Sequence, residues 1–181
     1  YRFDPLRQLN TAGHGTDVPL FHLAERFETR NYFGYLLDCE TRQGRRFALD
    51  QFRIEKEIAS AAFERLLSAL SARGADALVL THTAKCIDRW AEALRGDLET
   101  LFLVEGWRSH VIDLDDDLRG KTCTPMTLRR ADWLLAAARD HHAALTAQSA
   151  FFRHDEGKSQ AELLTTYERQ REDAQRYQVE A

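Results

Sequence analysis

The sequence predicts an α/β fold, in which a small, mostly parallel sheet with an antiparallel hairpin is followed by two long C-terminal helices. Two observations indicate the sheet. Continuous apolar runs alternate with a helical pattern over residues 75–114, and aromatic and aliphatic runs flank a polar, glycine-containing turn over residues 31–52. Two helix-start signals after residue 123 indicate the helices. A chain of 181 residues, 44% of them hydrophobic, is long enough for one domain with its own core.

The N-terminal part of the chain is predicted to contain an irregular arm, a hairpin and a helix. Residues 1–18 show no sustained periodicity and contain Gly13-His14-Gly15, which is typical of an irregular segment. Residues 31–52 are interpreted as the β-hairpin, with its turn at Gly44. Apolar residues then keep helical spacing for about five turns and predict a helix that ends at Gly74. These residues are Ile54, Ile58, Ala62, Leu66 and Ala69.

The middle of the chain is predicted to supply the parallel sheet. Residues 75–81, 99–105 and 109–114 are apolar runs of strand length, and residues 83–94 have a helical pattern. Such runs are typical of strands that are buried on both faces. The predicted organisation is an irregular arm, an α/β domain and a C-terminal helical extension, at residues 1–18, 19–152 and 153–181.

Two helices are predicted at the C-terminal end. Thr124 as the cap and Pro125 as the first helical residue start a helix that continues to about residue 151. The capping box Ser159-x-x-Glu162 starts the last helix. The apolar stripe of this last helix is thin and consists of Leu163, Tyr167, Ala174 and Tyr177. We therefore expect the last helix to pair with a partner helix or a second copy of the chain rather than complete the domain's core.

The composition argues against several classes of protein. A formal net charge of -4 does not supply the basic field that nonspecific binding to nucleic acid or anionic membranes needs. The three cysteines are scattered, so we predict neither a disulfide framework nor a cysteine zinc site, and we expect a cytoplasmic location. No apolar run approaches the roughly 18 residues of a membrane span, and no signal peptide is recognisable. The chain opens with Tyr1 rather than Met, so we expect a segment to precede it.

One candidate site lies where the predicted strands end. The first strand is followed by His82, the second ends at Glu105, and the third continues into Asp113 and Asp115. If the strands are neighbours, these four side chains meet at one edge of the sheet. Carboxylate oxygens and an imidazole nitrogen suit Mg²⁺ or Mn²⁺, with Asp113 and Asp115 as the metal ligands. The pattern then predicts a metal-dependent phosphoesterase or nuclease, whereas the simpler interpretation of the acidic run is a solvated turn.

A second candidate site is the basic tip of the predicted hairpin. Arg42, Arg45 and Arg46 cluster there, and Tyr35 lies on the first strand of the hairpin. Because arginines bind phosphates and aromatic rings stack on bases, this pattern predicts contact with nucleic acid. The other interpretation is that the charges prevent edge-to-edge association of strands.

Three functions follow from these patterns, in this order. The first is a noncatalytic intracellular binding or regulatory protein in nucleic-acid transactions, without a cofactor, that acts through the basic hairpin and a self-associating C-terminal helix. The alternative is the metal-dependent phosphoesterase or nuclease, with Mg²⁺ or Mn²⁺ as its cofactor. The third is a structural domain of a larger assembly.

Overall fold

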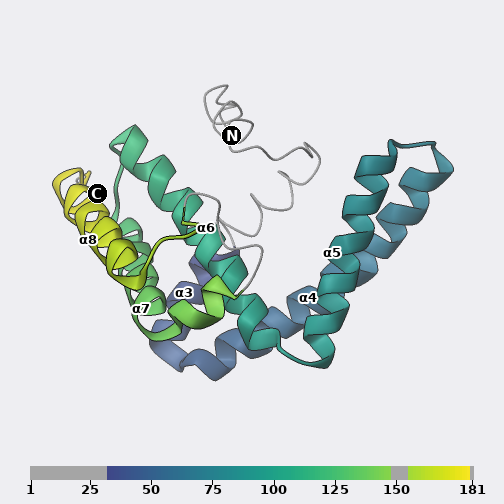
Figure 1. Ribbon diagram of the computed structural model, residues 1–181, viewed down its shortest axis with the longest axis horizontal. Coiled ribbons are helices and arrows are strands. Elements are labelled where there is room, and N and C mark those ends of the chain that lie inside the picture. The colour runs from purple at the N-terminus through teal and green to yellow at the C-terminus, as the bar shows by residue number, and fades with distance from the viewer. Residues whose placement is uncertain (1–31, 148–154, 180–181) are drawn as a thin grey trace.

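The structure is a computed structural model that describes residues 32–147 and 155–179, apart from the side chains of residues 41–43. These residues form six α-helices: α3 (Gly34–Gln43), α4 (Arg45–Ala72), α5 (Ala77–Arg95), α6 (Leu98–Gly120), α7 (Pro125–Thr146) and α8 (Gln160–Arg176). Helices α6, α7 and α8 pack together as a body, and the paired α4 and α5 project from it (Figure 1). Within the described ranges the only β pairing is one isolated bridge, between Cys123 and Gln178. The predicted α/β class is therefore wrong, and the fold is all-α; the predicted irregular arm, residues 1–18, lies outside the described residues.

The runs predicted as parallel strands are instead helical. Residues 75–81 contain the start of α5, and α6 contains both of the later predicted strands. An aspartate caps each helix: Asp76 Oδ1 accepts a hydrogen bond from the Leu78 N–H (2.7 Å), and Asp97 Oδ1 accepts one from the Thr100 N–H (3.0 Å). Helix α6 is buried on most of its circumference. A central helix of this kind shows the same continuous apolar run as a buried strand.

The predicted β-hairpin at residues 31–52 is also wrong. From Gly34 on, this segment forms α3 and the start of α4, on either side of Gly44 with its φ of 85°. The aromatic side chains that suggested strands pack in a helical core. The ring centroids of Phe33 and Phe52 are 6.0 Å apart, and Phe52 lies 5.2 Å from the ring centroid of Phe102 in α6. The aromatic runs therefore mark a buried cluster between helices.

Both predicted C-terminal helices are present, and their starts are confirmed. Helix α7 begins at Pro125, where Thr127 Oγ1 accepts a hydrogen bond from the Thr124 N–H (2.9 Å). Helix α8 follows Ser159, whose side chain forms the predicted capping box with Glu162. The predicted continuation of the first of these helices towards residue 151 falls on residues 148–154, which lie outside the described residues.

Helix α8 completes the hydrophobic core of the body. Leu163, Tyr167 and Ala174 are buried in one cluster with side chains of α6 and α7. Before α8, the buried Asp155 accepts hydrogen bonds from the Tyr167 hydroxyl (2.8 Å) and from the Trp107 indole N–H of α6 (3.1 Å). The apolar stripe that the sequence analysis assigned to a partner helix is therefore buried within the chain itself.

The projecting pair of helices, residues 54–90 of α4 and α5, is called the arm from here on; it is distinct from the predicted irregular segment at residues 1–18. It turns at the predicted helix stop, Gly74, which has a φ of 68°. There the Gly74 N–H donates to the Ser71 carbonyl (3.1 Å) and the Ala75 N–H donates to the Leu70 carbonyl (3.0 Å), as in a Schellman motif. Among the described side chains of α4, none beyond Lys56 is buried. The part of α4 beyond Lys56 therefore contributes no fully buried side chain to a hydrophobic core.

Candidate functional site

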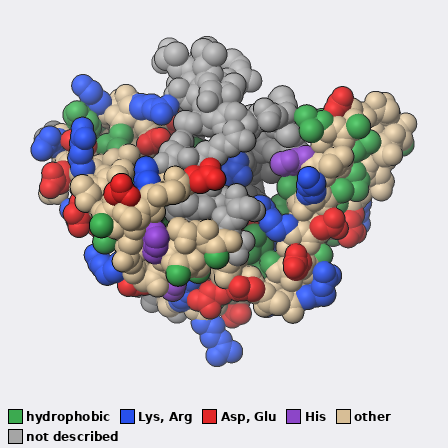
Figure 2. Space-filling view, viewed as in Figure 1, with side chains coloured by type: hydrophobic (Ala, Val, Ile, Leu, Met, Phe, Trp, Pro, Cys, Tyr) green, Lys and Arg blue, Asp and Glu red, His purple; other side chains and the backbone are tan. Residues whose placement is uncertain are grey.

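Helix α4 carries an apolar stripe that the fold leaves at the surface. Its large side chains, Ile54, Ile58 and Leu66, are 49%, 66% and 41% exposed, and Ala62 and Ala69 are exposed as well. Because residues three or four apart share one side of a helix, these five lie along one side of α4, called the α4 stripe, and the exposed Arg65 lies on the same side, three residues after Ala62. Hydrophobic side chains are visible on the arm in Figure 2, in a view in which α5 lies in front of α4 (Figure 1).

A second side of α4 holds the arm together. The rings of Phe63 and Trp90 meet edge to face, with centroids 4.8 Å apart. Thr83 of α5 is buried, and its hydroxyl donates to the Val79 carbonyl (2.8 Å). Helix α4 thus has two apolar sides, and α5 covers one of them.

A buried lysine joins the arm to the body. The Lys56 side chain is 0% exposed, and its ammonium nitrogen lies 2.5 Å from Glu105 Oε2 of α6 and 3.1 Å from Glu55 Oε2. The same nitrogen lies 4.9 Å from the ring centroids of both Phe52 and Trp90. Burial deprives an ammonium of its hydration, and carboxylates and aromatic faces replace that hydration here. These residues, with Arg89, form the Lys56 cluster.

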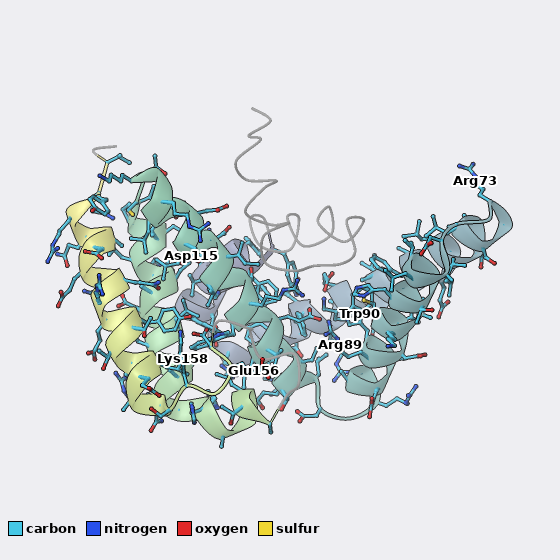
Figure 3. The ribbon with its side chains drawn as sticks, turned by 45° about the horizontal axis from the view of Figure 1, so that its top comes forward. Arg73, Arg89, Trp90, Asp115, Glu156 and Lys158 are labelled. Carbon is cyan, nitrogen blue, oxygen red and sulfur yellow. The ribbon has the colours of Figure 1, made fainter. Side chains whose placement is uncertain are left out.

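Glu105 connects three helices through this cluster. Its Oε1 accepts hydrogen bonds from the Trp90 indole N–H (3.1 Å) and from the Arg89 guanidinium (3.0 Å), both of α5. Its Oε2 faces the α4 lysine. Figure 3 shows Arg89 and Trp90 towards the base of the arm and Arg73 at its far tip. Desolvation raises the pKa of the Glu55 carboxyl, and the adjacent ammonium opposes this change. Because the Lys56 side chain is fully buried, it is not accessible to a substrate, and the contacts of Glu105 connect α4 and α5 to α6.

The three carboxylates predicted for metal binding have cationic partners within the chain. Glu105 belongs to the Lys56 cluster, Asp113 Oδ2 lies 2.9 Å from Arg130 Nη2, and Asp115 Oδ2 lies 3.7 Å from Arg119 Nη2. The sheet edge that was expected to gather them is absent, because the segments concerned are helices of the described chain. Each carboxylate therefore has a cation nearby, and the partly exposed pair of Asp115 with Arg119 is the weakest of the three.

His82, the fourth predicted residue, is half-buried on α5. Desolvation lowers the pKa of its imidazole, and the nearby Arg89 and Lys85 lower it further. Nowhere in residues 32–147 and 155–179 do three His, Cys, Asp or Glu side chains come together in a group that could hold a metal ion. The structure thus does not bring the predicted Mg²⁺ or Mn²⁺ ligands into one site.

Two of the three arginines predicted for nucleic-acid contact, Arg45 and Arg46, lie near acidic side chains. Arg45 is paired with one glutamate of α3 (3.1 Å) and one of α6 (3.0 Å). Arg46 is exposed and lines a surface hollow of about 370 Å³, whose other charged residues are Asp50, Arg53, Asp97 and Glu99. Tyr35 is exposed on α3, and the side chain of Arg42 lies outside the described part of the chain. Nucleic-acid contact through these residues stays a prediction.

Sequence reasoning missed Lys56 and the exposure of the α4 stripe. Lys56 occupies a helical position in phase with Phe52 and Phe63, on the side of α4 that packs against α5. A lysine at an apolar position of a helix is a signal for a buried ion pair, because lysine is rarely buried without a partner. The sequence places apolar residues on two sides of α4, and one neighbouring helix covers only one side. This pattern was the signal that the second apolar side lies at the surface.

Comparisons with protein-family models, with curated proteins and with solved structures find no match for this chain. Across the described helices, none combines the length and the apolar character needed to cross a membrane. The described surface and its chemistry therefore carry the functional argument.

Proposed function

We propose that this chain is a noncatalytic protein-binding protein whose arm is its contact element. The observation that carries this proposal is the α4 stripe, a mainly apolar face about 22 Å long on a helical hairpin that projects from the body. Single exposed apolar residues are common on soluble proteins. A contiguous apolar face is instead typical of a surface that contacts another protein.

The surroundings of the charged residues support the noncatalytic part of the proposal. The carboxylates that the sequence offers for catalysis are held by Lys56, Arg130 and Arg119. A general acid, general base or metal ligand must reach the reacting atoms. The pairs of Glu105 with Lys56 and of Asp113 with Arg130 join two helices each, and the pair of Asp115 with Arg119 lies within α6.

The exposed apolar side chains of the stripe contribute to the free energy of a contact with a partner. Full burial of one leucine or isoleucine side chain stabilises a complex by about 1.5–3 kcal/mol. Ile58 and Leu66 are already partly covered, so together they contribute about 2–3 kcal/mol to an interface. The exposed alanines between and beyond them allow a partner helix to approach closely.

The proposal is tested by photo-crosslinking in the cells that produce the protein. Benzoylphenylalanine replaces Ile58 in one variant and Ser71, which is exposed on a different side of α4, in the other. We expect crosslinks to a polypeptide from position 58, few from position 71, and loss of the first set on Leu66→Glu. Equal yields from the two positions, or none from position 58, would contradict the proposal.

A further inference from the structure

We draw no further inference here: the strongest candidate, the exposed and mainly apolar α4 stripe of the arm, already carries the proposed function, and nothing in the structure shows what covers it.

Discussion

Lys56 is the residue that links the arm to the body through charge. Its ammonium and the Glu105 carboxylate have both lost most of their hydration and depend on each other and on the aromatic rings around them. When one member of a buried ion pair is removed, the other is left uncompensated, which costs more than the pair itself contributes. The effect of a substitution here therefore depends on whether one charge or both are removed.

We expect Lys56→Met to lower the free energy of unfolding by about 3 kcal/mol, because Glu105 then stays buried without the lysine. Lys56→Met combined with Glu105→Leu removes both charges, and most of the loss is recovered. Urea denaturation measures both values, with Lys85→Met at an exposed position of α5 as the control. A loss no larger than that of the control would contradict the importance of the pair.

His110 makes the stability of the fold depend on pH. It is fully buried on α6, with its ring centroid 4.8 Å from that of Trp133. Burial, and to a lesser extent the charge of Arg130, lower the pKa of its imidazole to about 3. A histidine in the unfolded chain titrates near pH 6.5, so between about pH 6.5 and 3 the unfolded chain binds a proton that the folded chain does not. The contribution of the neutral His110 imidazole to the free energy of unfolding is fully present above pH 6.5. It is lost as the pH falls from about 6.5 to 3.

We therefore expect the free energy of unfolding to fall by up to about 1.4 kcal/mol per pH unit below pH 6.5 on account of His110. His110→Phe removes this slope between pH 6.5 and 5, a range above that in which most carboxylates titrate. Urea denaturation at a series of pH values measures the slope, and His82→Gln, at a half-buried position, serves as the control with a smaller change. Equal slopes in wild type and His110→Phe would show that the histidine is protonated in the folded state.

At the scale of elements, several helix ends were predictable from the sequence because they depend on local chemistry. Gly74 ends α4 in the left-handed conformation that glycine adopts without strain. Thr124-Pro125 and Ser159-x-x-Glu162 begin α7 and α8 as predicted. In each case the decisive contacts join residues that are close in sequence, so the signal is present before any tertiary structure forms.

The central elements were not predictable in the same way. An apolar run of six or seven residues fits a buried strand and one side of a buried helix equally well. The residues that decide between them here are Asp76 and Asp97, which cap α5 and α6 just ahead of the runs. When these two aspartates are interpreted as N-terminal caps, the sequence favours helices over strands for the runs that follow. The burial of α6 on most sides, which produced the strand-like run, is a property of the whole fold.

The start of α8 depends on Asp155, and we expect Asp155→Ala to destabilise the protein by about 3 kcal/mol. The change leaves the buried Trp107 indole N–H and Tyr167 hydroxyl without their acceptor, and it removes the ion pair with Lys158 (2.9 Å). Urea denaturation gives the loss, and hydrogen exchange shows faster exchange in α8. Glu156→Ala, next to it and exposed, is the matched control. A comparable loss in both variants would contradict the anchoring role.

At the scale of the whole molecule, the candidate sites depended on arrangements that the sequence does not contain. The metal site needed a sheet edge to gather His82, Glu105, Asp113 and Asp115, and the described segments are helices whose carboxylates pair with cations instead. The apolar spacing of the α4 stripe was visible in the sequence. Its exposure was not, because exposure depends on which sides of α4 the rest of the chain covers.

We expect millimolar Mg²⁺ or Mn²⁺ to leave the melting temperature of the EDTA-treated protein unchanged, because the carboxylates concerned already have cationic partners. Asp113→Asn lowers the melting temperature with or without metal, since it weakens the buried pair with Arg130. A metal-dependent rise that disappears on Asp113→Asn with Asp115→Asn would reinstate a metal site.

The Lys56 cluster also sets an order of events during synthesis. Lys56 precedes its partner Glu105 by 49 residues (105 − 56), so both helices of the arm are synthesised before the α6 carboxylate that compensates the lysine. At about 5–20 residues per second, that interval is roughly 2.5–10 s. During this time the ammonium stays hydrated and the base of the arm cannot close around it. The nascent hairpin therefore takes its final direction only after α6 has emerged and docked.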